Sequence, residues 1–172
     1  VLAGAVSHGV SHEEFQAFCR QFSPLPLVSL AVEVPGVPSV ISGNQGAMRA
    51  LMTHLLQEHH CHRLAFLAGP PGQQESEIRL RVFREELRAA GVEPDPTWIV
   101  HGDFTRESGF HAVEALLEEG ALPFQGIVAA NDAMALGALD ALTLRGYHVP
   151  RDLLLTGFDD SEESRFSQPS LT

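Results

Sequence analysis

The sequence predicts an α/β fold built on a parallel sheet. Short apolar runs alternate with longer amphipathic segments along the chain. This alternation indicates strands joined by crossover helices, which pack on the faces of a parallel sheet. The clearest unit spans residues 127–142, where the apolar run 127–130 ends in Asn131 and Asp132 and a helical pattern starts at once. We interpret this unit as a buried strand that leads directly into a helix.

The spacing of apolar residues predicts the individual elements. Met48, Met52 and Leu55 recur at intervals of four and three residues, which places them on one face of a helix. Gly91 and Gly146 follow similar stripes and predict helix ends, because glycine adopts the left-handed backbone there without strain. We expect strands at residues 1–6, 26–31, 38–41, 63–68, 97–101, 126–130 and 152–157. We expect helices at residues 11–22, 44–58, 75–90, 106–119 and 132–145, and a short helical turn at 161–166.

Composition and charge narrow the class of protein. A hydrophobic fraction of 44% and a charged fraction of 19% in 172 residues are typical of one globular domain or slightly more. The net charge of −11 repels nucleic-acid phosphates, so we expect any DNA binding to come from a module outside this chain. No apolar run approaches the roughly 20 residues of a membrane span, and the two cysteines suit no disulfide framework. We therefore expect a cytoplasmic segment without membrane contact, and the missing initiator Met indicates a fragment of a longer protein.

A change of composition near Ser42 predicts a domain boundary. The short segment before it is rich in proline: Pro24, Pro26, Pro35 and Pro38. About four βα units follow, which is enough for a compact α/β lobe. We therefore divide the chain into residues 1–41 and residues 42–172.

Polar or turn-forming residues follow four of the strands expected after Ser42. They are Gly69 with Pro70, the segment 101–104, Asn131 with Asp132, and Asp159 with Asp160. In a parallel sheet these four strand ends lie on one edge, which is where open α/β sheets bind ligands. The sequence therefore predicts a small-molecule site that can offer carboxylate, amide and aromatic surfaces.

The motifs at these strand ends resemble the effector-binding domain of LacI/GalR-type transcription regulators. The order of the motifs along the chain is the same as in the family. They are HRLAFLAGP, GDFTRESGF, AANDAMALGALDAL, VPRDLLLTGFDD and QPSLT. The resemblance covers residues 39–172 well and 1–38 loosely. It implies a periplasmic-binding-protein-like fold in which two Rossmann-like lobes clamp a ligand. This chain would then hold a nearly complete C-terminal ligand-binding lobe and part of the N-terminal lobe.

The resemblance also implies four ligand-binding residues. Arg79 matches an arginine that holds ligand hydroxyls, and its planar fork suits paired oxygens. Asn131 matches an amide that contacts the ligand, since an amide both donates and accepts hydrogen bonds. Asp159 matches an aspartate that accepts from two adjacent hydroxyls. Phe104 matches an aromatic position that often packs on the sugar ring.

These positions have structural alternatives. Arg79 could be a solvated arginine on a helix, and Asn131 could cap the helix that it precedes. Phe104 could belong to the core. We expect Asp132 to be an acid at a helix start, which the helix dipole favours, and we expect Asp160 to be structural.

Two segments depart from the family pattern. LVSLAV places Ser29 near a position where the family often has an acid, which puts a contact from the N-terminal lobe in doubt. The loop GQQESEIRLR carries Glu75 and Glu77 close to Arg79, which can alter the choice of ligand. Further family contacts normally lie past Thr172.

Histidines gather at residues 54–62, around an expected helix end. His54 and Glu58 have the i,i+4 spacing that could hold a metal, but a polar helix end with imidazoles near the negative end of the dipole explains the same residues. We predict the polar helix end and no metal site. We also predict no cofactor and no catalytic residue, because the sequence shows no nucleophile–base pair or cofactor fingerprint.

Together these observations predict a sensor domain that binds a sugar-like small molecule. We expect a homodimer in which the ligand closes the two lobes and shifts a two-state equilibrium read by an attached output module, a helix-turn-helix in the family. The same sensor fused to a diguanylate cyclase or a histidine kinase is one alternative, and a sugar-binding transport receptor is another. An enzyme that uses Asp159 or Asp132 as acid or base is a third class, which no motif supports.

Overall fold

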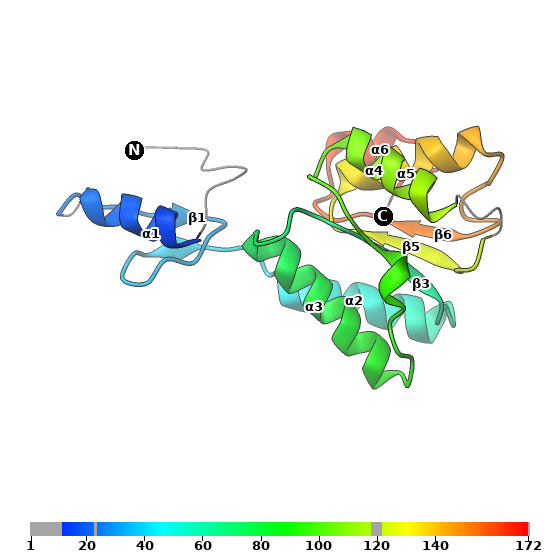
Figure 1. The fold of residues 1–172 in the computed structure, drawn as a ribbon, viewed down its shortest axis with the longest axis horizontal. Coiled ribbons are helices and arrows are strands. Elements are labelled where there is room, and N and C mark those ends of the chain that lie inside the picture. The colour runs from blue at the N-terminus through cyan, green and yellow to red at the C-terminus, as the bar shows by residue number, and fades with distance from the viewer. Residues whose placement is uncertain (1–11, 23, 118–121, 172) are drawn as a thin grey trace.

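The computed structural model describes residues 12–22, 24–117 and 122–171 and contains two parallel sheets. In the first, β1 (Ser29–Leu30) pairs with β2 (Ser39–Val40). The second has four strands in the order β4-β3-β5-β6. Its strands are β3 (Leu64–Ala68), β4 (Ile99–His101), β5 (Gly126–Ala129) and β6 (Leu154–Thr156). Figure 1 shows the first sheet and α1 (His12–Gln21) apart from the body that the second sheet forms.

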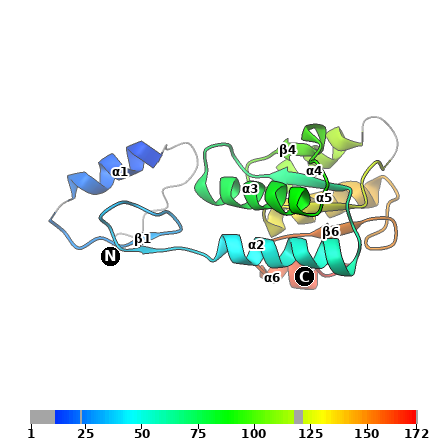
Figure 2. The ribbon, with the colours of Figure 1, turned by 90° about the horizontal axis from the view of Figure 1, so that it is seen from below.

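Helices cover both faces of the four-stranded sheet. On one face lie α2 (Asn44–Thr53) and α3 (Gln74–Ala89), and on the other lie α4 (Arg106–Leu116) and α5 (Asp132–Leu144) (Figures 1 and 2). The short α6 (Glu162–Phe166) packs against α5. This arrangement confirms the predicted α/β fold with a parallel sheet.

The alternation of side chains along β3 explains the two layers of core. Phe66 packs with apolar residues of α2 and α3, whereas Ala65 and Leu67 pack with those of α4 and α5. Successive side chains of a strand point to opposite faces, so a central strand covered on both sides must be apolar throughout. All five residues of β3 are buried accordingly.

Side-chain caps fix where four of the helices begin. In each case a side-chain oxygen accepts a hydrogen bond from the backbone amide three residues further on, which satisfies a donor that the helix leaves free. The capping residues are Gln73 for α3, Thr105 for α4, Asn131 for α5 and Ser161 for α6.

The strands expected at 26–31 and 38–41 are shorter in the structure, Ser29–Leu30 and Ser39–Val40, and two further expected elements differ in type. The helix expected at 44–58 is α-helical only to Thr53 and continues as a turn of π-helix, η1 (His54–Glu58). The strand expected at 97–101 begins as a 3-10 turn, η2 (Pro96–Trp98), because proline at the first position and the Asp95 cap favour a helical turn. The strand expected at 1–6 lies outside the described residues, and the domain boundary near Ser42 stays a prediction.

Two glycines allow α4 and α5 to touch backbone to backbone. A Cβ at Gly109 would lie 2.1 Å from the carbonyl oxygen of Met134, and a Cβ at Gly137 would lie 1.8 Å from that of Arg106. Any larger residue would force the helices apart. The close contact holds together the starts of α4 and α5, which carry two of the candidate site residues.

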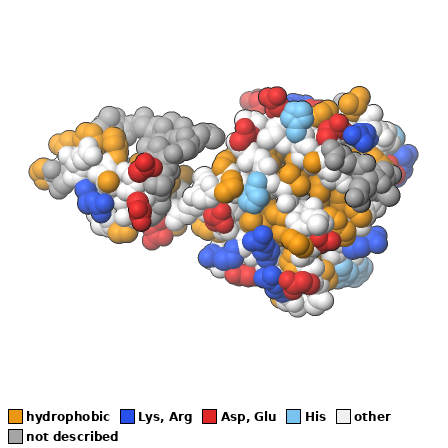
Figure 3. Space-filling view, in the orientation of Figure 1, with side chains coloured by type: hydrophobic (Ala, Val, Ile, Leu, Met, Phe, Trp, Pro, Cys, Tyr) orange, Lys and Arg blue, Asp and Glu red, His pale blue; other side chains and the backbone are white. Residues whose placement is uncertain are grey.

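The surface of the described residues carries charges of both signs. On the face in view, arginine side chains lie among acidic ones (Figure 3). The exposed apolar side chains Leu30 and Val40 lie on β1 and β2, so this small sheet buries little apolar surface by itself. Among the described residues, no helix combines the length and apolar character needed to cross a membrane.

Candidate functional site

The parallel pairing of the second sheet brings the predicted strand ends to one edge. β3 pairs in parallel with β4 and with β5, and β5 pairs in parallel with β6. Gly69 and the segments 102–104 and 157–160 directly follow these strands, and Asn131 is two residues past the end of β5. The predicted convergence is therefore confirmed for the backbone, and the side chains decide what this edge can do.

Arg79 of α3 is the centre of the site. Its side chain is buried, with 3% of the residue exposed. Nε donates to Oδ1 of Asn44 at 2.9 Å, and Nη1 donates to the carbonyl oxygen of Ala130 at 2.6 Å. The guanidinium carbon lies 4.0 Å from the centroid of the Phe158 ring, within the range of a cation–π contact. The alternative of a solvated arginine is therefore wrong.

Two carboxylates lie beside the third nitrogen of this guanidinium. Nη2 of Arg79 is 3.6 Å from Oδ1 of Asp159 and 3.8 Å from Oε1 of Glu75. Both distances exceed the usual length of a hydrogen bond, so these are ion pairs without a direct bond. Burial lowers the pKa of Arg79, while Asp159 and Glu75 raise it. Nη2 thus keeps hydrogen-bonding capacity that the protein does not use fully.

Asp159 is the exposed partner of this pair. Half of its side chain is accessible, and burial of the rest raises the pKa of the carboxyl above its usual value. The Arg79 charge lowers this pKa, but Asp132 and Glu75 raise it further. Without a ligand, the ionised carboxylate is therefore held in a setting that disfavours it.

The loop that carries Asp159 has an unusual backbone, and Asp132 holds it on both sides, by its backbone amide at Phe158 and by its carboxylate at Ser161. Asp159 and Asp160 have φ values of 113° and 57°, a region that costs energy for residues other than glycine. Asp132 accepts from the backbone amide of Ser161 at 2.7 Å, and Asp160 pairs with Arg165. Asp132 lies in the first turn of α5 and Asp160 has a structural ion pair, as expected, and the contact of Asp132 with Ser161 also fixes the loop.

Asn131 and Phe104 are linked at the starts of α5 and α4. Oδ1 of Asn131 accepts from the amide of Met134 at 2.9 Å, which is the expected cap, and Nδ2 donates to the carbonyl oxygen of Phe104 at 3.0 Å. The Phe104 ring is half-buried and covers Gly69, where a Cβ would lie 2.3 Å from the ring. Phe104 thus packs on the core, and its φ of 68° lets its carbonyl meet Asn131.

The structure brings the four predicted residues into one chain of contacts. Phe104 bonds to Asn131, the neighbouring Ala130 accepts from Arg79, and Arg79 faces Asp159. Whether these four side chains hold a ligand stays a prediction.

Sequence reasoning missed two members of this network. Asn44 is buried at the start of α2, where its amide accepts from Arg79 and donates to Glu75. Phe158 forms the surface under the guanidinium. Asn44 carried no signal beyond a helix start, because its partner lies 35 residues away. Phe158 directly follows the strand expected at 152–157, and nothing in the sequence marked it as a partner of Arg79.

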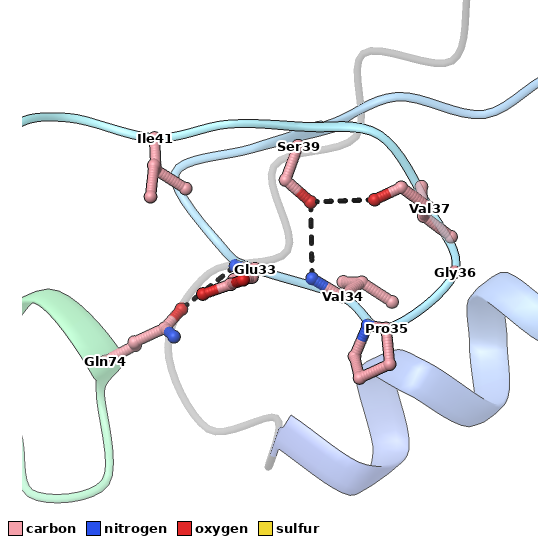
Figure 4. A pocket seen from close by; sticks show the side chains of 8 residues that line it. All are labelled: Glu33, Val34, Pro35, Gly36, Val37, Ser39, Ile41 and Gln74. Carbon is pink, nitrogen blue, oxygen red and sulfur yellow. Dashed lines mark hydrogen bonds between the residues drawn. The ribbon is translucent and has the colours of Figure 1, made fainter.

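A separate hollow of about 570 Å³ lies between the β1–β2 segment and the start of α3 (Figure 4). Apolar side chains such as Val34 and Ile41 line it together with Glu33 and Gln74. Oε1 of Gln74 accepts from the backbone amide of Glu33 at 3.0 Å, which joins the two segments. Arg79 and the other three predicted residues do not line this hollow. The candidate site is therefore defined by the contacts among those four residues and not by the hollow.

Comparison with known proteins shows the family of this domain. The family model of the periplasmic binding protein-like domain matches residues 52–172. The HTH-type transcriptional regulator CelR of Thermobifida fusca is 37% identical over 143 residues, which are 83% of this chain and 42% of CelR. The HTH-type transcriptional repressor CytR of Escherichia coli K12 is 32% identical over 153 residues, which are 89% of this chain and 44% of CytR. The chain spans less than half the length of these relatives.

Solved structures agree with the sequence matches. A sugar-binding transcriptional regulator of the LacI family from Escherichia coli, complexed with phosphate, has a TM-score of 0.82 and 30% sequence identity. That match covers 95% of this chain and 59% of the regulator. A CelR–cellobiose complex has a TM-score of 0.77 and 30% identity, over 93% of this chain and 56% of CelR. The fold and its family are therefore established on both sequence and structure.

Proposed function

Because this chain belongs to the periplasmic-binding-protein-like domains of LacI/GalR-type regulators, we propose that it binds a small polar effector, a sugar or a similar compound. The observation that carries the proposal is the pair formed by Arg79 and Asp159. One is buried and fixed, and the other is half exposed on a tied-down loop. Such a pair offers a donor and an acceptor at one point of the sheet edge, which suits neighbouring hydroxyl groups.

Each predicted residue has a distinct part in this proposal. Nη2 of Arg79 donates to a ligand oxygen, and the Asp159 carboxylate accepts from two adjacent hydroxyls. The second N–H of the Asn131 amide donates to the ligand while its oxygen keeps capping α5. The exposed part of the Phe104 ring packs against the ligand. Because ligand hydroxyls would supply the donors that Asp159 lacks among the described residues, binding would relieve the carboxylate that burial disfavours.

The proposal extends to the whole regulator. We infer that ligand closes this lobe, residues 42–172, against an N-terminal lobe, of which residues 1–41 form a part. Closure shifts a two-state equilibrium that an output module reads. That module, outside this chain, would contact DNA, and the regulator would work as a cytoplasmic homodimer. The named relatives are transcription regulators, which favours this output over a cyclase, a kinase or a transport receptor. The role needs no catalysis, and the same relatives are repressors and regulators without a named enzymatic activity.

A ligand screen followed by one substitution tests the proposal. The full two-lobed protein is screened by thermal shift against neutral sugars and nucleosides, and the Kd of a hit is measured by calorimetry. Asp159→Asn should weaken that hit by about 100-fold, because two hydrogen bonds to a charged acceptor contribute about 1.5 kcal/mol or more each.

Asp152→Asn is the matched control for this substitution. It makes the same chemical change at the opposite end of β6, on a carboxylate that pairs with Arg151 and not with Arg79. The control should leave the Kd within about twofold. An unchanged Kd in Asp159→Asn, with a ligand that binds wild type, would refute the assigned site.

A further inference from the structure

The π-helical turn after α2 places two histidines against each other. The backbone amide of His59 donates to the carbonyl oxygen of His54 at 3.3 Å, which is the five-residue hydrogen bond of a π-helix. In an α-helix residues four apart share a face, but the extra residue in this turn moves that relation to residues five apart. His54 therefore contacts His59. The spacing in the sequence had suggested Glu58 as its partner.

The two imidazoles have the geometry of ligands to one ion. Their Nε2 atoms are 3.1 Å apart. Two imidazoles that bind one ion at about 2.0–2.1 Å hold their nitrogens about 2.9–3.4 Å apart, for angles from about 90° to tetrahedral. At the observed separation, rings directed at a common ion would have centroids about 4.8 Å apart, and rings directed head-on at each other about 5.4 Å. The observed centroid distance is 4.7 Å, which matches two rings directed at a common ion.

The surroundings suit an exchangeable cation. Both rings are exposed, and they lie at the C-terminal end of a helix, whose partial negative charge favours positive ions. His59 also lines a hollow with Arg63 and Leu154, which lie at the amino ends of β3 and β6. The histidine pair is thus at the sheet edge opposite to Asp159 and is independent of the proposed effector site.

We propose that His54 and His59 form a two-histidine chelate for a divalent transition-metal ion. Imidazole suits Cu²⁺, Ni²⁺ and Zn²⁺, and Cu²⁺ binds such a site more tightly than Ni²⁺. Across the described ranges, no group of three or more His, Cys, Asp or Glu side chains is placed to hold a metal. Water therefore fills the remaining coordination positions, and the ion exchanges readily.

Metal titration of the chain tests the chelate directly. CuSO4 and NiSO4 are titrated by calorimetry, and the Cu²⁺ form at less than one ion per chain is examined by electron paramagnetic resonance. We expect one preferred ion per chain and hyperfine coupling to two imidazole nitrogens. His54→Gln and His59→Gln should each weaken Cu²⁺ binding at least tenfold and reduce the coupling to one nitrogen.

Two neighbouring histidines provide the matched controls. His60→Asn and His62→Gln change imidazoles of the same segment that are not members of the His54–His59 pair, and both should keep wild-type affinity and spectrum. Circular dichroism melts verify that each variant is folded. Three results would overturn the proposal: unchanged affinity in His54→Gln and His59→Gln, equal losses in all four variants, or a single coupled nitrogen in wild type. The last would leave the two rings as a hydrogen-bonded pair only.

Discussion

Replacing Gly137 with alanine tests whether the close contact of α4 and α5 holds the candidate site together. A Cβ at this position would lie 1.8 Å from the Arg106 carbonyl oxygen and 2.8 Å from the Phe110 nitrogen. Both neighbours are backbone atoms, which no side-chain rotation can move away. Ordinary contact begins near 3.4 Å, so the two helices must separate by roughly 1.5 Å.

The expected magnitude follows from two opposing effects. Alanine is about 1 kcal/mol better than glycine inside a helix. Overpacking costs about 1–3 kcal/mol, and here it also strains the hydrogen bond between Asn131 and Phe104, worth about 1 kcal/mol. We expect Gly137→Ala to lower the free energy of unfolding by about 2 kcal/mol in urea denaturation followed by circular dichroism.

Gly46→Ala is the control for this measurement. Gly46 lies in α2, is exposed, and has no atom within 4 Å of the position that a Cβ would take. Alanine should therefore stabilise the chain there by up to about 1 kcal/mol. Equal and stabilising changes at both positions would show that α4 and α5 are not in the contact described, and the link between that contact and the site would be wrong.

Three further substitutions address the charges of the site. Arg79→Lys should lower the free energy of unfolding by about 2–3 kcal/mol in urea, because lysine cannot replace a fork that reaches both Asn44 and a backbone carbonyl; a neutral effect would argue against this network. The raised pKa of Asp159 means that the folded chain binds this proton more tightly than the unfolded chain, so ionisation lowers stability above that pKa. Asp159→Asn should therefore be more stable than wild type near pH 7, with a difference that shrinks as the pH falls towards about 4; a difference independent of pH would contradict the assignment. Asp132→Ala should speed hydrogen exchange of the Ser161 amide, which loses its acceptor, and unchanged exchange would show that the loop is held by other contacts.

The sequence was sufficient for the fold because its signals are local and periodic. The apolar run before Asn131 and the stripe after it specify a strand and a helix without reference to distant residues. Parallel pairing then follows from the repeated strand–helix order. The gathering of Asn131 and Asp159 at one edge is a consequence of that topology, which is why it could be predicted.

The side-chain network could not be predicted, because its contacts join residues far apart in the chain. Arg79 bonds to Asn44, 35 residues before it, and to Ala130, 51 residues after it. Neither partner has a residue type or a spacing that marks it. The π-helical turn is equally hidden, since the apolar stripe through Leu55 fits a continuous α-helix. One added residue in that turn redirects His54 from Glu58 to His59.

The two charged residues of the candidate site, Arg79 and Asp159, differ in how many contacts with the rest of the protein hold them. Arg79 has two hydrogen bonds, an aromatic face and two nearby carboxylates, so its position is fixed before any ligand arrives. Asp159 has an ion pair with Arg79 at 3.6 Å, and its loop holds its backbone at an unfavourable positive φ. A residue that adds little to the stability of the fold, yet is held in place by Asp132, is better explained by a partner that binds there than by packing. In the proposed site, the arginine therefore sets the position of the ligand, and the aspartate supplies the unused acceptors that select for hydroxyl donors.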